Sequence, residues 1–239
     1  MTRRPRLNTL TRMLVTESPK TGLPTPSLET EAARYALLRR LAPSMRHLLV
    51  VNLQPIGMIY EVMDRRLRAT HPDLAQIQES AHKINGFAKA ALASCIDVVG
   101  WLAPDDAVTT TVQEGVRECA SLLATSLSFR GYALRNEVQA APGQVRRSAM
   151  RSLLSAALLH VTDTSRPPAD LAIGSEAGED AVTLILTVRS TQGDKGFTAE
   201  AAYRKLEWAD LQALAAGEGV QLIRDADAIR FVLPWAQAH

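Results

Sequence analysis

The sequence predicts an α+β protein, in which a helical hairpin forms a dimeric four-helix bundle and an α/β sandwich follows it. Three observations predict this fold. Apolar residues recur at helical spacing along two long stretches between residues 43 and 103, which a short turn joins. After residue 108, helical patterns alternate with short strand-like runs. A lone hairpin cannot bury its apolar stripe well, so two copies are expected to pair.

The composition fits a protein with a core and excludes several classes. Hydrophobic residues make up 46% of the 239 residues, and the formal net charge is only +2, so the whole molecule is not a polyanion binder. No apolar run approaches membrane-spanning length, so no membrane insertion is expected. Cys95 and Cys119 each lie in a helical pattern, which favours buried, reduced thiols of a cytoplasmic protein over a disulfide or metal pair.

The N-terminal residues 1–26 predict a disordered tail, because four prolines interrupt them. The tail also carries arginines without a neighbouring acid, and we favour a solvated tail over a nucleic-acid arm. No nucleic-acid partner is therefore expected. The rest divides into a helical hairpin domain, 27–104, and an α/β domain, 105–239. The tail arginines are Arg3, Arg4, Arg6 and Arg12.

The hairpin domain begins with a helical run over 29–41 and continues with a helix over 43–68. Pro43 marks either a kink or a fresh first turn, and Pro55 should bend the second run. A turn follows, with Pro72 at the first position of the next helix. That helix carries the clearest heptad pattern of the chain, which predicts a bundle seam. The seam positions are Leu74, Ile77, Ala81, Ile84, Ala88, Ala91, Cys95, Val98 and Leu102.

The α/β domain shows three further helical patterns and five strand patterns. Their order predicts one mixed sheet with helices on one face, closed by a terminal hairpin around Asp225–Asp227. The helices are expected at 108–128, 144–160 and 199–216, and the strands at 132–138, 170–174, 182–189, 220–224 and 228–233.

One histidine in the hairpin stands in a distinctive frame. His47 is followed five positions later by an Asn-Leu-Gln triplet that begins at Asn52. With the order of elements, this frame resembles the core of bacterial sensor histidine kinases over residues 28–235. The resemblance implies a dimerisation and phosphotransfer hairpin, with His47 as phospho-acceptor and Arg46 and Asn52 in supporting roles. The alternative is that His47 is an ordinary half-exposed helix histidine.

The ATP-binding motifs of that family are degenerate in this chain. By register, Ala156 stands where the family places the asparagine that holds Mg²⁺ on the ATP phosphates, and alanine offers no ligand oxygen. The adenine-binding Asp and paired glycines are also missing, since Arg189 follows the strand and Gly193 and Gly196 stand alone. We therefore expect a degenerate site around Ala156, Arg189 and Gly193, with no bound nucleotide, cofactor or metal.

The resemblance implies a function in a bacterial two-component phosphorelay. The chain is similar to kinase-like histidine phosphotransferases, which relay phosphoryl groups between response-regulator receiver domains without ATP. Its expected partners are receiver domains and a second copy of itself, and it is an enzyme only if it forms phosphohistidine. Two alternatives remain: a non-catalytic dimeric scaffold that binds a kinase or a response regulator, and a divergent ATP-dependent histidine kinase.

Overall fold

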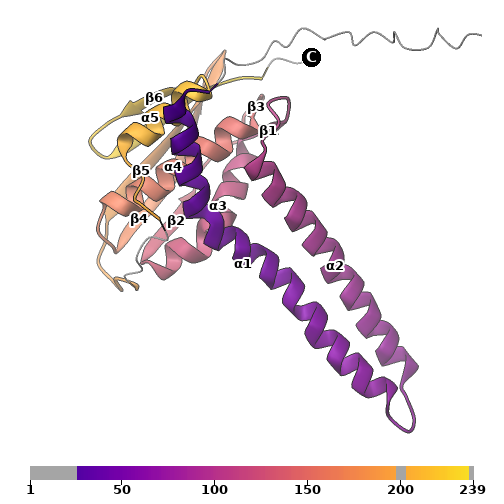
Figure 1. Cartoon of the computed structure of the whole chain (residues 1–239). Coiled ribbons are helices and arrows are strands. Elements are labelled where there is room, and N and C mark those ends of the chain that lie inside the picture. Colours follow the sequence, from indigo (N-terminus) through magenta and orange to yellow (C-terminus); the bar gives the residue numbers. More distant parts are fainter. Residues whose placement is uncertain (1–25, 198–202, 237–239) are drawn as a thin grey trace, which may run out of the picture.

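The computed structural model describes residues 26–197 and 203–236, and it has two parts (Figure 1). Helix α2 (Leu74–Leu102) and the second half of α1 (Leu28–Leu67) form an antiparallel arm that projects from an α/β domain. The α/β domain contains β1 (Thr109–Thr111), α3 (Val112–Phe129), β2 (Tyr132–Asn136), β3 (Gln144–Arg146), α4 (Arg147–Thr164), β4 (Ala169–Ala177), β5 (Ala181–Ser190), α5 (Trp208–Gly217), β6 (Gln221–Arg224) and β7 (Ala228–Pro234).

Helix α1 is continuous. Of the two alternatives predicted for Pro43, a new helix start is therefore wrong, and a kink within one helix is the other. Ser27 caps the helix by accepting a 3.1 Å hydrogen bond from the Thr30 N–H, and both Pro43 and Pro55 lie inside. Figure 1 shows α1 changing direction where it leaves the α/β domain. A proline removes one backbone hydrogen bond and bends a helix, but packing on both sides of Pro43 keeps the helix intact.

Helix α2 begins at Leu74 behind an Asp73 cap, and Pro72 therefore precedes the cap instead of opening the helix. The Asp73 carboxylate accepts from the N–H groups of Ala75 and Gln76, at 3.0 and 3.2 Å. An aspartate cap satisfies two N–H groups that a proline at this place would leave unpaired. The predicted position of Pro72 is thus corrected.

The predicted seam of α2 is only partly buried within the hairpin. Ala91 is buried and Ile77, Ile84 and Val98 are half-buried, but the other five predicted seam residues are exposed. Serines take part of the seam instead: Ser80 and Ser94 are buried, and each donates its hydroxyl proton to a carbonyl of its own helix. Such local hydrogen bonds let a polar residue occupy a buried helix position. The exposed five are Leu74, Ala81, Ala88, Cys95 and Leu102.

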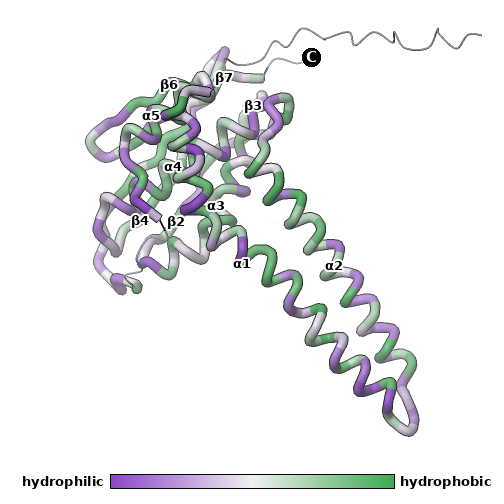
Figure 2. Tube along the Cα trace, in the orientation of Figure 1, coloured by the Kyte–Doolittle hydropathy of each residue, from purple (hydrophilic) through white to green (hydrophobic). Residues whose placement is uncertain are grey.

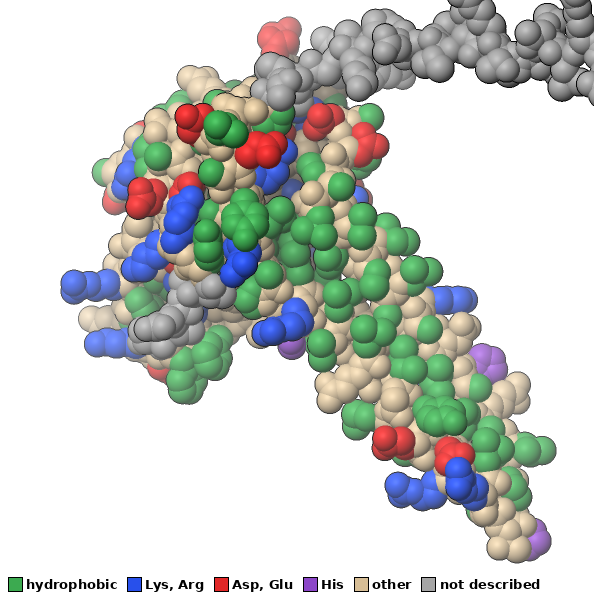
Figure 3. All heavy atoms as spheres, viewed as in Figure 1, with side chains coloured by type: hydrophobic (Ala, Val, Ile, Leu, Met, Phe, Trp, Pro, Cys, Tyr) green, Lys and Arg blue, Asp and Glu red, His purple; other side chains and the backbone are tan. Residues whose placement is uncertain are grey.

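The arm therefore presents an apolar outer face. Ile96, in the last two turns of α2, has 66% of its surface exposed, and large apolar side chains of α1 are exposed as well. Figures 2 and 3 show hydrophobic residues along the arm. The exposed large apolar residues of the arm include Val51, Met58, Val62, Leu92, Ile96, Val99 and Leu102.

The α/β domain is built on a five-stranded mixed sheet with the order β2-β4-β5-β7-β6. Only β2 and β4 run parallel, and β6 and β7 form the predicted terminal hairpin. Alternate strand residues such as Leu171, Leu184 and Phe231 are buried and form one core with α3, α4 and α5. The mixed sheet with helices on one face is confirmed.

Three predicted helix starts in this domain are wrong. Residues 109–111 and 144–146 pair as a two-stranded sheet. Helix α3 therefore begins only at Val112, and α4 only at Arg147. Threonines at 109–111 favour a strand because their branched side chains restrict the backbone. Helix α5 begins at Trp208, since a capping box of Glu207 and Asp210 sets its start; the first residues of the predicted 199–216 helix lie outside the described residues.

The two cysteines differ in their surroundings, and the expectation that both are buried is wrong for Cys95. Cys119 has no exposed surface, and burial raises the pKa of its thiol to about 12. Thiolate is the reactive form, so we expect Cys119 in a Cys95→Ser variant to react with dithiobis-nitrobenzoate roughly a thousandfold more slowly than a free thiol. Fast labelling of the folded variant would contradict this, and urea should restore the normal rate.

Candidate phosphotransfer site

The first half of α1 lies on the α/β domain and makes a layer above its helices (Figure 1). This covering segment, residues 28–45, contacts α3, α4 and α5 through a buried helical stripe. Thr30 donates its hydroxyl proton to the Ala213 carbonyl of α5 at 3.0 Å. The stripe consists of Thr30, Ala33, Ala36, Leu37, Arg40, Leu41 and Met45, which recur every three or four residues.

A buried ion pair fixes the covering segment to the end of α4. The side chains of Arg40 and Asp163 are 4% and 2% exposed. The two terminal nitrogens of the guanidinium donate to the two carboxylate oxygens, at 2.6 and 2.8 Å. Asp163 also accepts from Arg130 at 3.4 Å and from the Leu206 N–H at 3.3 Å. Charge-assisted, bidentate bonds of this kind orient both partners, and they can offset the cost of removing the charges from water.

A second buried carboxylate fixes the other end of the covering segment. Glu218, directly after α5, is 1% exposed and accepts from Arg34 of α1 at 3.2 Å. It also accepts the Ser148 hydroxyl proton of α4 at 3.0 Å and lies 3.6 Å from Arg146. Together with Asp163, this carboxylate holds α1, α4 and α5 together at two points.

Helix α4 is consequently closed in. Every residue from Ser148 to Thr162 is buried, and Ala156 in its middle has no exposed surface. The other residues expected at the degenerate site do not share this position: Arg189 is exposed at the end of β5 and lines a hollow with Asp225, and Gly193 is exposed in open space. With no ligand oxygen and no room, Ala156 does not fit Mg²⁺ or an ATP phosphate.

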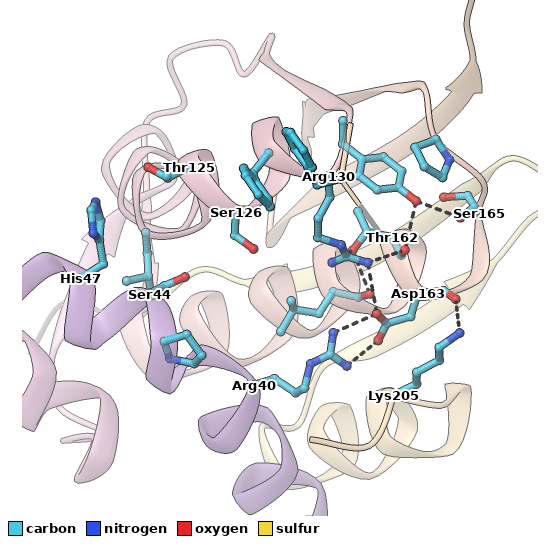
Figure 4. A pocket seen from close by; sticks show the side chains of 17 residues that line it. Arg40, Ser44, His47, Thr125, Ser126, Arg130, Thr162, Asp163, Ser165 and Lys205 are labelled. Atoms are coloured by element: carbon cyan, nitrogen blue, oxygen red, sulfur yellow. Dashed lines mark hydrogen bonds and ion pairs between the residues drawn. The ribbon is translucent and has the colours of Figure 1, made fainter. Parts of the chain in front are cut away.

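His47 is exposed on α1, just past the point where the helix leaves the α/β domain. Its side chain lines a pocket of about 530 Å³, which we call the His47 pocket, between α1, α3 and the last turn of α4 (Figure 4). Figure 4 places His47 and Ser44 at one end of the pocket, with Arg130, Asp163 and Lys205 at the other. An exposed imidazole is a nucleophile that a partner can reach.

The two residues that were predicted to support His47 differ in their exposure. Arg46 is exposed beside His47, whereas Asn52 is half-buried between the arm helices. Its amide donates to the Leu48 carbonyl at 3.2 Å and to the Ser94 hydroxyl at 3.0 Å. Asn52 thus joins α1 to α2 below the histidine.

A separate charged cluster attaches α2 to the α/β domain. Asp97 accepts from Arg147 at 3.1 Å and from Arg151 at 3.0 Å, and both arginines also bond Glu118 of α3. Burial alone would raise the pKa of Glu118, but hydrogen bonds from Arg151 and Arg147 outweigh it, and the pKa is lowered. The stabilisation from Glu118 is therefore present above the pKa of an unfolded glutamate and is lost as the pH falls.

Reasoning from sequence missed Asp163 and Glu218. A sequence signal for these two buried acids was nevertheless present. Each carboxylate lies at the C-terminal end of a helix, where the helix dipole disfavours negative charge, and Asp163 comes soon after the short apolar run 156–159. An acid in such a place needs a cationic partner from elsewhere in the fold.

Two further features concern the part of the chain that the structure describes. Within residues 26–197 and 203–236, no group of three or more His, Cys, Asp or Glu side chains could hold a metal ion. Over the same residues, no helix has the length and apolar character needed to cross a bilayer.

Solved structures with a similar arrangement of elements include kinases and a phosphotransferase. A histidine kinase from Burkholderia phymatum matches at 13% identity over 88% of this chain and 100% of its own, with a TM-score of 0.43. A bacterial phosphotransferase matches at 14% identity, over 88% and 98%, with a TM-score of 0.40. The histidine kinase AdeS of Acinetobacter baumannii matches at 11% identity, over 76% and 96%, with a TM-score of 0.40. No family model and no curated protein sequence matches the chain.

Proposed function

We propose that this chain is a histidine phosphotransferase of a two-component phosphorelay and passes phosphoryl groups between receiver domains without ATP. One observation carries the proposal: His47 is exposed on the arm, while the covering segment and α5 close the face of α4 where a kinase would need its nucleotide. An acceptor histidine without a nucleotide site must receive its phosphoryl group from another protein.

The proposed chemistry needs little from this chain. A ring nitrogen of neutral His47 attacks the phosphorus of an aspartyl phosphate on the receiver, so that an N–P bond forms and the O–P bond to the aspartate breaks. The aspartate leaves as a carboxylate, and the remaining ring proton passes to solvent. The receiver's own metal ion neutralises the transferring group, and the exposed Arg46 adds positive charge beside His47. Transfer to a second receiver is the reverse of these steps.

Pairing of two arms into a four-helix bundle belongs to this proposal. In a bundle, each helix packs against two neighbours, so each needs two apolar faces. One hairpin covers the predicted heptad of α2 only in part: Ile84 is half-buried, whereas Leu102 is exposed, as is Ile96 outside the heptad. A second hairpin that packs against the arm would cover much of this apolar outer face.

The test of the relay is phosphoryl transfer from phosphorylated receiver domains of the same genome. The wild-type chain should acquire an acid-labile label, and His47→Gln should abolish it while leaving the fold intact, because an amide is not phosphorylated. His82→Gln is the matched control, since His82 is also an exposed arm histidine. Absence of label in the wild type, or equal label in His47→Gln, would favour the scaffold. Loss of label only in His82→Gln would move the acceptor to His82.

The same order of elements also fits a divergent ATP-dependent kinase, and nucleotide binding separates the two. We expect no binding of Mg-ATP at micromolar concentrations by calorimetry, because Ala156 offers no ligand oxygen and has no exposed surface. Micromolar affinity, together with His47 labelling from ATP, would establish the kinase instead.

A further inference from the structure

The His47 pocket has the size and lining of a ligand site. Its volume of about 530 Å³ lies in the usual range for small-molecule sites, roughly 300–1,000 Å³. The rings of Phe129 and Phe197 stack at its edge, with centroids 4.6 Å apart. Apolar walls come from α1, α3, α4 and the loop after α4. These walls include Pro43, Leu122, Phe129, Leu159 and Pro167.

The polar end of the pocket is positively charged. Three cations line the pocket, Arg40, Arg130 and Lys205, against the single carboxylate Asp163, which leaves a charge of +2. Arg130 donates three hydrogen bonds, to Thr162 and Asp163. A guanidinium carries five N–H groups, so two remain for another acceptor. An apolar chamber with a cationic end fits an organic anion.

We propose that the His47 pocket binds a small organic anion that has a flat apolar body. The anionic group pairs with Arg130 and Lys205, and the body lies against Phe129 and Leu159 toward the His47 end (Figure 4). The bound molecule would then cover His47 and exclude a receiver domain. That regulatory consequence rests on the proposed function, whereas the binding itself does not. The site also differs from the closed face of α4, because Ala156 is not among its lining residues.

Two matched probes test the site with the full-length chain. Anilinonaphthalene sulfonate carries the anion and the flat body, and N-phenyl-1-naphthylamine is the same body without charge. We expect the sulfonate to bind at least about tenfold more tightly, since charge-assisted hydrogen bonds exceed 1.4 kcal/mol. Lys205→Gln should reduce this preference several-fold, and Lys89→Gln on the arm should not. Equal affinities of the two probes would contradict the proposal that the charged end of the pocket recognises an anionic group.

A pocket-filling pair separates the pocket from the apolar arm. Ser126 lines the pocket on α3 and Ser128 is exposed two residues further along the same helix. Ser126→Trp should abolish sulfonate binding and Ser128→Trp should leave it unchanged. Sulfonate should also slow the modification of His47 by diethyl pyrocarbonate, with His82 as internal reference. Binding that survives Ser126→Trp, or no protection of His47, would overturn the proposal. Neither measurement involves a phosphoryl donor, so failure here is distinct from failure of the relay.

Discussion

Replacing Asp163 by alanine is expected to lower the free energy of unfolding by about 3–5 kcal/mol, because it leaves a buried guanidinium without its partner. Arg40 is only 4% exposed at its side chain, and its two hydrogen bonds to Asp163 are 2.6 and 2.8 Å long. Arg130 and the Leu206 N–H lose an acceptor at the same time. Urea unfolding followed by tryptophan fluorescence, at one protein concentration for all variants, measures the loss.

Two further variants test the cause of that loss. Asp225→Ala breaks an exposed ion pair, in which the side chain of Arg230 is 38% exposed and that of Asp225 is 45% exposed. This variant should lower the free energy of unfolding by less than about 1 kcal/mol. The double variant Arg40→Met with Asp163→Leu removes both buried charges and should recover most of the stability. A loss below about 1 kcal/mol for Asp163→Ala would mean that Arg40 reaches water once its partner is gone.

Placing a charge on the outer face of the arm is expected to raise the dissociation constant of the dimer by at least about a hundredfold. Ile96→Asp puts a carboxylate into the proposed interface, and twofold symmetry puts it there twice. Desolvating unpaired charges costs several kcal/mol, and about 1.4 kcal/mol corresponds to a factor of ten. Sedimentation velocity over a range of concentrations measures the change.

The choice of position 96 follows from the observed register of α2. Ile84 is half-buried within a single chain, so a charge there would damage the monomer as well as the dimer. Leu28→Asp is the control, because Leu28 is an exposed apolar residue at the start of α1, away from the arm. A wild-type chain that stays monomeric at micromolar concentration would contradict the dimer, and so would an Ile96→Asp variant that dimerises normally.

The helices and strands whose signals are local could be predicted from the sequence. The apolar repeat of α2, the turn before it, and the alternating runs of β4, β5 and β7 predicted the arm and the sheet, because periodicity reports which face of an element is buried. The exposure of His47 at the edge of a helical stripe was also visible in the spacing. Its role as phospho-acceptor came from the resemblance and stays a prediction.

The partner that covers each face could not be predicted, because it depends on contacts between residues far apart in the chain. Periodicity reports that a face is apolar but not which partner covers it, so the heptad of α2 was assigned to a buried seam although five of its nine residues are exposed in the single chain. In the same way, the sequence left open whether Pro43 kinks one helix or begins another, and contacts on both sides of the proline hold α1 as one helix. The pairing of Arg40 with Asp163 joins residues 123 positions apart, and it closes α4 and forms the His47 pocket. No local propensity encodes such a contact, because the cost of burying each charge is offset only where the folded chain brings its distant partner beside it.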